Sequence, residues 1–173
     1  MKRQKDMEIS ACCQDVVESA RPSPVEQLFS ACLDHVHPST SLQVRCGGTE
    51  RLAGVGTVVA LSELTSFHHP PDFDLIVCTF ARGQGPGPEL VAALQYCRML
   101  LKPGGRLALL LPGDIDQNWY HSLFAHLPFA RAMGRECPRV ALMVQAGCID
   151  IRKQVRPGLG RVISGARPGR GFY

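Results

Sequence analysis

The stretch FDLIVCTF, residues 73–80, is followed at residues 101–111 by LKPGGRLALLL. Each contains a continuous apolar run, which is typical of a strand buried on both faces of a parallel sheet. Between them, apolar residues recur at helical spacing over residues 89–101, and the Lys-Pro-Gly-Gly sequence that follows is a stop signal for a helix. The segment is therefore predicted to be a βαβ unit with a right-handed crossover.

Further elements are predicted on both sides of this unit. They are a helix over residues 24–36, strands over 42–46 and 57–61, a helix over 114–127 and a last strand over 139–145. Ser23 is suited to cap the first helix, and Pro24 to occupy its first position. Because strands and helices alternate, we expect an α/β fold in three layers, a sheet with helices on both faces.

The basic residues are concentrated near the end of the chain. The chain has 173 residues, the size of one domain, and a net charge of +4, and six of its basic residues lie in the last 22 positions. We predict an N-terminal extension over residues 1–22, an α/β domain over 23–151 and a basic Gly/Pro-rich tail over 152–173. The tail fits a solvated end of the chain and, alternatively, a segment that attracts nucleic-acid phosphates.

Neither a membrane segment nor a metal site is indicated by the residue pattern. The apolar runs are far shorter than the roughly 20 residues that a bilayer span requires, and residues 1–10 contain no apolar signal core. The eight cysteines include no C-x-x-C pair and no zinc-finger spacing. We therefore expect free thiols, a reducing compartment such as the cytoplasm, and no contact with a membrane.

The residues from Asp72 to Pro112 resemble the second half of class I S-adenosylmethionine-dependent methyltransferases. In that family an FDLIV-type strand precedes a helix, and an LKPGG turn leads from this helix into the next strand, as in this sequence. The resemblance implies a mostly parallel, Rossmann-like sheet. It implies little about catalysis, because the glycines of the LKPGG turn serve the reversal of the chain.

The resemblance also implies where a cofactor would bind. The counterparts of the glycine loop and of the acidic residue that holds the ribose are Gly47, Gly48 and Glu63. Thr79 and Asp114 follow or end strands, and ligands of open α/β sheets bind beyond the carboxyl ends of strands. Asp114 is equally suited to cap the next helix. No catalytic residue is assigned.

The cofactor half departs from the family pattern. Gln43 and Arg45 stand where an acidic residue is usual, and only eight residues, 49–56, separate the first two predicted strands. A parallel crossover with its helix needs roughly ten to twelve residues or more. Residues 63–72 are likewise too few for another helix and strand. The fold is therefore expected to be truncated at its cofactor end.

Two functions remain open on this basis. The first is a non-catalytic protein-interaction scaffold without cofactor, similar to the N-terminal domain of anamorsin-type proteins of cytosolic iron–sulfur assembly, where its role would be docking. The second is an active methyltransferase that holds S-adenosylmethionine in a compact site and modifies a small molecule, a protein or RNA. A protein partner is expected for the first, and fold alone does not decide between them.

Overall fold

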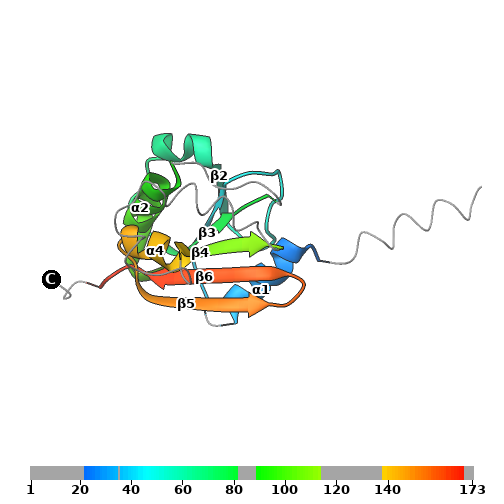
Figure 1. Cartoon of the computed structure of the whole chain (residues 1–173). Helices are drawn as coiled ribbons and strands as arrows, with labels where there is room; N and C mark the ends of the chain where they lie inside the picture. Colours follow the sequence, from blue (N-terminus) through cyan, green and yellow to red (C-terminus); the bar gives the residue numbers. More distant parts are fainter. Residues whose placement is uncertain (1–21, 35, 82–88, 114–137, 170–173) are drawn as a thin grey trace, which may run out of the picture.

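A six-stranded sheet forms the centre of the molecule (Figure 1). The computed structural model describes residues 22–34, 36–81, 89–113 and 138–169. The strand order is β2-β1-β3-β4-β6-β5. The strands are β1 (Ser41–Arg45), β2 (Thr57–Ala60), β3 (Phe73–Thr79), β4 (Leu101–Pro112), β5 (Ile149–Arg156) and β6 (Gly160–Ala166). The first four are parallel, whereas β6 runs antiparallel to both β4 and β5. The predicted mostly parallel sheet is confirmed.

Helix α1 (Pro24–Leu33) covers one face of the sheet. Its start is fixed locally by a capping box, in which Glu26 N donates to Ser23 Oγ at 3.1 Å and Ser23 N donates to Glu26 Oε2 at 3.0 Å. The predicted cap and Pro24 at the first position are confirmed, and the helix ends three residues before the expected limit. Leu28 and Phe29 of this helix pack against a cluster that includes Leu75 of β3.

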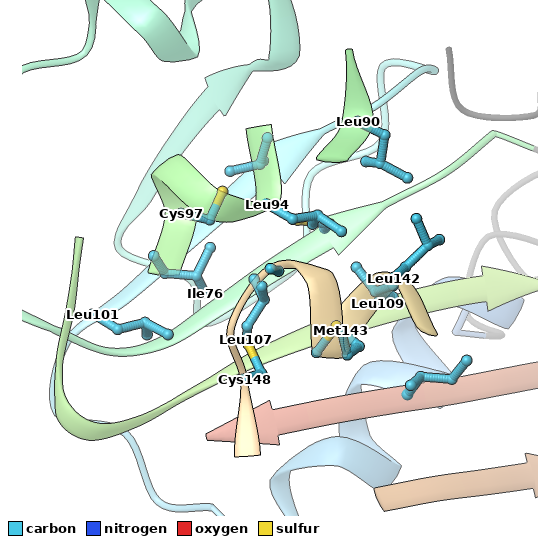
Figure 2. Close-up of a cluster of buried hydrophobic side chains, with 14 of the residues drawn as sticks. Ile76, Leu90, Leu94, Cys97, Leu101, Leu107, Leu109, Leu142, Met143 and Cys148 are labelled. Carbon is cyan, nitrogen blue, oxygen red and sulfur yellow. The ribbon is translucent and has the colours of Figure 1, made fainter. Parts of the chain in front are cut away.

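Helices α2 (Leu90–Leu100) and α4 (Pro138–Gln145) cover the other face (Figure 2). Leu94 and Cys97 of α2 are fully buried, in the cluster that holds Ile76 of β3 and Leu107 of β4. A 3₁₀ helix, η2 (Leu61–Ser66), follows β2. The sheet with helices on both faces is the expected three-layer arrangement, and β3-α2-β4 is the expected βαβ unit.

The prediction of a strand at residues 139–145 was wrong, because this segment is helix α4. A short apolar run does not by itself distinguish a strand from a buried helical segment. Leu142 and Met143 are buried, whereas Val144 is 41% exposed, a pattern that fits one helical face and not a strand buried on both sides. The helix predicted at 114–127 lies outside the described residues.

The separate tail predicted at 152–173 was also wrong, because most of its residues belong to the sheet. Strands β5 and β6 form a hairpin, and β6 pairs with β4 along its length, from Arg106 opposite Ala166 to Pro112 opposite Gly160. The domain therefore extends beyond the predicted limit of residue 151. Strand β5 is an exposed edge strand, and charged side chains on such an edge discourage pairing with other chains. The charge of this edge strand resembles that of a solvated tail, which is why composition alone does not distinguish the two.

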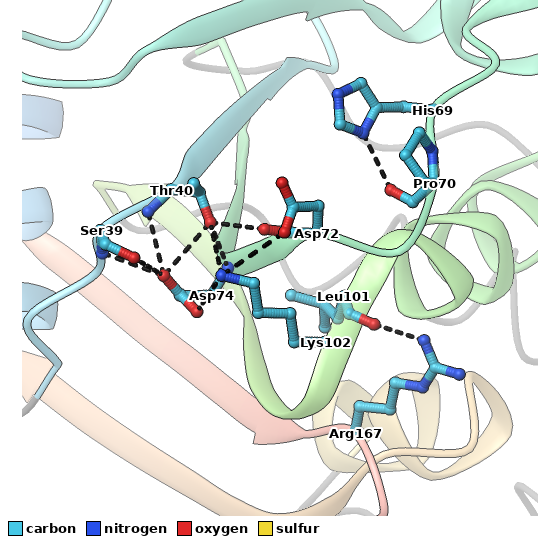
Figure 3. A network of polar contacts seen from close by, with 9 residues as sticks. All are labelled: Ser39, Thr40, His69, Pro70, Asp72, Asp74, Leu101, Lys102 and Arg167. Carbon is cyan, nitrogen blue, oxygen red and sulfur yellow. Dashed lines mark hydrogen bonds and ion pairs between the residues drawn. The ribbon is translucent and has the colours of Figure 1, made fainter.

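A polar network joins the amino ends of the parallel strands (Figure 3). The carboxylate of Asp74, in the FDLIV strand, accepts from Ser39 N and Thr40 N at 3.0 Å each, and from Ser39 Oγ. Lys102 Nζ, from the LKPGG segment, lies 3.0 Å from Asp74 Oδ1. The Ser39 hydroxyl, with help from Lys102, holds the pKa of the Asp74 carboxyl well below its ordinary value. The two motifs that identify the fold are thus joined by one carboxylate.

Asp74→Asn is expected to reduce the dependence of stability on acid pH. Because the pKa of Asp74 is lowered in the folded state, its stabilising effect is present above the unfolded pKa of about 3.9 and is lost as the pH falls toward the folded value. At neutral pH the variant should lose about 1 kcal/mol of the free energy of unfolding. Urea unfolding at a series of pH values between neutral and strongly acidic measures both effects.

Asp34→Asn is the matched control, because Asp34 forms an exposed ion pair with Arg156 at 3.3 Å. Exposed ion pairs contribute little, so its unfolding curves should follow those of the unmodified chain within about 0.5 kcal/mol. If the Asp74 variant kept the full acid dependence of the unmodified chain, the network would not be the source of that dependence.

Candidate functional site

The carboxyl ends of β1, β2 and β3 meet at one edge of the sheet. Arg45, the last residue of β1, lies opposite Ala60 of β2 on one side and opposite Thr79 of β3 on the other. This register brings three predicted site regions to the same edge: the glycine pair after β1, Glu63 after β2 and Thr79 at the end of β3. It is the edge at which open α/β sheets bind ligands.

The glycine pair forms a turn beside the segment that follows β3. Cys46 N donates to Thr79 O at 2.8 Å, which fixes the start of this turn. Gly47 and Gly48 have φ values of 142° and 74°, a region that side chains disfavour. A Cβ at position 48 would lie 3.5 Å from Cβ of Ala81, so the backbone conformation, more than space, calls for glycine there. The expectation of a glycine-dependent turn is consistent with this geometry.

Gln43 of β1 is fully buried and organises the interior of the site. Its Nε2 donates to Thr79 Oγ1 at 3.1 Å and to Glu50 O at 3.0 Å, and its Oε1 accepts from Leu52 N at 2.9 Å. The Thr79 hydroxyl is therefore buried and engaged within the protein. Sequence reasoning noted Gln43 only as a departure from an acidic residue, although a glutamine within an apolar strand is itself a signal of a buried hydrogen-bond centre.

The connection between β1 and β2, residues 46–56, contains no helix. Leu52 and Val55 of this connection are buried in the same cluster as Leu28 and Phe29 of α1. Ser23 Oγ, at the start of α1, also donates to Glu50 Oε1. The expected shortening of the first crossover is confirmed, and the shortened loop is packed on the sheet through apolar and polar anchors.

The charged groups at this edge differ from the family pattern. Glu63 is exposed on η2, and its Oε2 accepts from Ala60 N at 3.4 Å, so it caps its own helical turn. Arg45 is half-buried, with Nη1 3.5 Å from Thr49 O and with Nε buried and lacking a described partner. A positive charge thus ends the strand at which the resemblance leads one to expect a negative one.

The last predicted site residue, Asp114, lies outside the described residues. The ring of His69, in the segment before β3, clusters with two aromatic rings, its centroid 5.7 Å from that of Phe67 and 4.9 Å from that of Phe73. In the part of the chain that the structure describes, no three His, Cys, Asp or Glu side chains gather as a metal site. None of the helices in this part is both long enough and apolar enough to span a bilayer.

Comparison with known proteins identifies the fold. No protein-family model matches the sequence, and no curated protein matches it. Among solved structures, the apo S-adenosylmethionine-dependent methyltransferase SibL matches with a TM-score of 0.51 and 18% identity, over 84% of this chain and 55% of its own. An O-methyltransferase family protein from Burkholderia thailandensis matches with a TM-score of 0.51 and 13% identity, over 84% of this chain and 57% of its own. An S-adenosylmethionine-dependent methyltransferase from Thermotoga maritima matches with a TM-score of 0.50 and 14% identity, over 84% of this chain and 89% of its own.

The chain therefore has the Rossmann-like fold of class I methyltransferases. It spans little more than half the length of the SibL and Burkholderia proteins. At these identities the likeness concerns the fold, and function depends on the site.

Proposed function

We propose that the chain is a methyltransferase-like domain without catalytic activity, which serves as a scaffold for a protein partner. The observation that carries this proposal is the buried Gln43 amide, which holds the β1–β2 connection on the sheet by two hydrogen bonds, to Glu50 O and from Leu52 N, and joins it to Thr79 of β3 by a third. The Thr79 hydroxyl and the Leu52 N–H, which a nucleoside cofactor could otherwise contact at this edge, are both bonded to Gln43.

The requirements of S-adenosylmethionine support this view. Its ribose hydroxyls call for an acidic side chain, but Glu63 is bonded to Ala60 N and Arg45 carries the opposite charge. Its carboxylate is suited to free backbone N–H groups at a helix N-terminus. Here no helix follows the glycine turn before β2, and the Leu52 N–H donates to Gln43. The residues present therefore fit the cofactor poorly.

The cellular setting proposed for the scaffold follows from the thiols. The cysteines whose side chains the structure describes, at positions 32, 46, 78, 97 and 148, are all free. Free thiols of this number are usual in a reducing compartment such as the cytoplasm. Docking within an iron–sulfur assembly complex is one role compatible with this setting and stays a prediction.

An active methyltransferase is the second candidate, because one feature of a cofactor site persists. Gly47 and Gly48 keep the conformations that let a backbone turn closely past a ligand, and the turn lies at the edge where α/β sheets bind ligands. In that case S-adenosylmethionine would bind between this turn and β3, and the methyl acceptor would be a small molecule, a protein or RNA.

Calorimetric titration with S-adenosylmethionine and with S-adenosylhomocysteine separates the two candidates. For the scaffold we expect neither heat of binding nor a thermal shift at ligand concentrations of about 1 mM. Micromolar binding, about −8 kcal/mol, that is lost in Gly48→Asp would overturn the scaffold proposal and establish the glycine turn as a cofactor site. If the scaffold proposal holds, a partner isolated with the chain should form a stoichiometric complex with it when both are purified.

A further inference from the structure

A cavity of about 240 Å³ lies at the edge of the sheet opposite the glycine turn. Its walls include Pro71 before β3, Pro103 at the start of β4 and Pro168 after β6. Proline fixes its own backbone torsion, so these walls lose little conformational freedom when a ligand binds. The two charged side chains that line the cavity are both arginines, Arg98 and Arg167.

Arg98 is positioned by backbone packing, with no acidic partner among the residues that the structure describes. It lies in the last turn of α2, and its guanidinium lies over Gly147, where a Cβ would be 3.2 Å from Cζ and Nε of the arginine. Its Nε is buried and has no hydrogen-bond partner among the described atoms. Because this Nε is buried against Gly147, the donors that Arg98 can offer a ligand are those of Nη1 and Nη2, which make no hydrogen bond to the described residues.

Arg167 is held beside the same cavity by the end of α2 (Figure 3). Its Nη1 donates to Met99 O at 2.9 Å and to Leu101 O, and its backbone N donates to Gly105 O at 2.8 Å. These contacts fix the guanidinium while its Nε and Nη2 make no hydrogen bond to the described residues.

The two arginines also lack a negative counter-charge in the described structure. No described carboxylate lies within 4.0 Å of either guanidinium. The nearby Asp72 carboxylate is 3.6 Å from Lys102 Nζ, which also pairs with Asp74. The cavity therefore holds two fixed positive charges with donors left over, and none of the described acidic side chains neutralises them.

We propose that this cavity binds a phosphomonoester group. A guanidinium presents parallel N–H donors that match two phosphate oxygens, and two such groups match a dianion. The volume suits a phosphoryl group with a short attachment, whereas sites for whole drug-sized ligands begin at roughly 300 Å³. The phosphomonoester could belong to a phosphorylated side chain of a protein or to a free metabolite. This site goes beyond the proposed function, because it lies at the other edge of the sheet.

Calorimetry on the full chain, in buffer free of phosphate, tests the proposal. The probes are inorganic phosphate, a pentapeptide with a central phosphoserine, its unphosphorylated counterpart and adenosine monophosphate. We expect saturable binding of at least one phosphorylated probe and none of the unphosphorylated peptide. Preference for the phosphopeptide would identify a protein ligand, and preference for phosphate or the nucleotide a free metabolite.

Matched variants distinguish the cavity from general electrostatic attraction. Arg98→Gln should raise the dissociation constant by at least about tenfold, and Arg98→Lys, which keeps the charge but not the paired donors, by a smaller factor. Lys153→Gln removes the same charge from the exposed edge strand and should leave binding unchanged. Circular dichroism and thermal melting establish that each variant is folded.

Two results would overturn the phosphomonoester site. One is the lack of saturable binding of any phosphorylated probe, and the other is an equal loss in Arg98→Gln and Lys153→Gln. Neither bears on the scaffold proposal, which is judged separately by titration with S-adenosylmethionine at the opposite edge.

Discussion

Gln43→Leu is expected to lower the free energy of unfolding by about 3 kcal/mol. Leucine has a similar volume, so the main loss is polar. The substitution leaves the Leu52 N–H and the Thr79 hydroxyl in the interior without their partner, and it frees Glu50 O. Each buried polar group left unsatisfied costs about 1–3 kcal/mol. Urea unfolding followed by circular dichroism measures the change.

Gln95→Leu is the matched control for this effect. Gln95 lies exposed on α2, where its Nε2 donates to Gln145 O at 3.2 Å, so the same substitution there should change stability by less than about 0.5 kcal/mol. Equal effects of the two variants would mean that Gln43 does not anchor the β1–β2 connection. The scaffold proposal would then lose its main support, which is that Gln43 occupies the polar groups where a cofactor would bind.

The βαβ centre of the fold was predictable because its signals are local and strong. The apolar run at β3 has to be buried on both faces, and few structures other than a central parallel strand achieve this. The capping box of α1 likewise involves residues three apart, Ser23 and Glu26, so its geometry follows from the sequence alone.

The C-terminal part was not predictable by the same means. Strand β5 exposes most of its residues, because it lies at the edge of the sheet, so it lacks the apolar run that marks β3. The segment of α4 is only eight residues long, too short for helical periodicity to become clear. In both cases long-range packing decides the structure, and no local signal reports it.

Some residues of the candidate sites could be named from the sequence, whereas others come together only in the folded chain. Gly47 and Gly48 were named from the family resemblance, and the structure places them in a turn with positive φ without testing whether they bind a ligand. The role of Gln43 depends on Glu50, Leu52 and Thr79, and the last of these is 36 residues away. The cavity of Arg98 and Arg167 joins α2 to the end of β6, a juxtaposition that exists only in the folded chain.

Gly160→Ala is expected to be the most damaging single substitution at the C-terminal hairpin. Gly160 begins β6 with φ of 140° and lies opposite Pro112 of β4. A Cβ there would be 2.2 Å from Leu111 O and 2.9 Å from Gly113 N. Because these are backbone atoms of the adjacent strand, no side-chain rotation relieves the overlap. We expect a loss of about 4 kcal/mol or more in the free energy of unfolding.

Gly158→Ala, in the turn two residues before Gly160, separates overlap from backbone strain. Gly158 has φ of 76°, but a Cβ there would meet no atom within 4 Å, so only the conformational cost of about 1–2 kcal/mol is expected. The difference between the two variants in urea unfolding therefore measures the contact between the hairpin and β4. If both lost the same small amount, strand β6 would not be part of the cooperative sheet, and residues 152–166 would behave as the separate tail that their composition suggests.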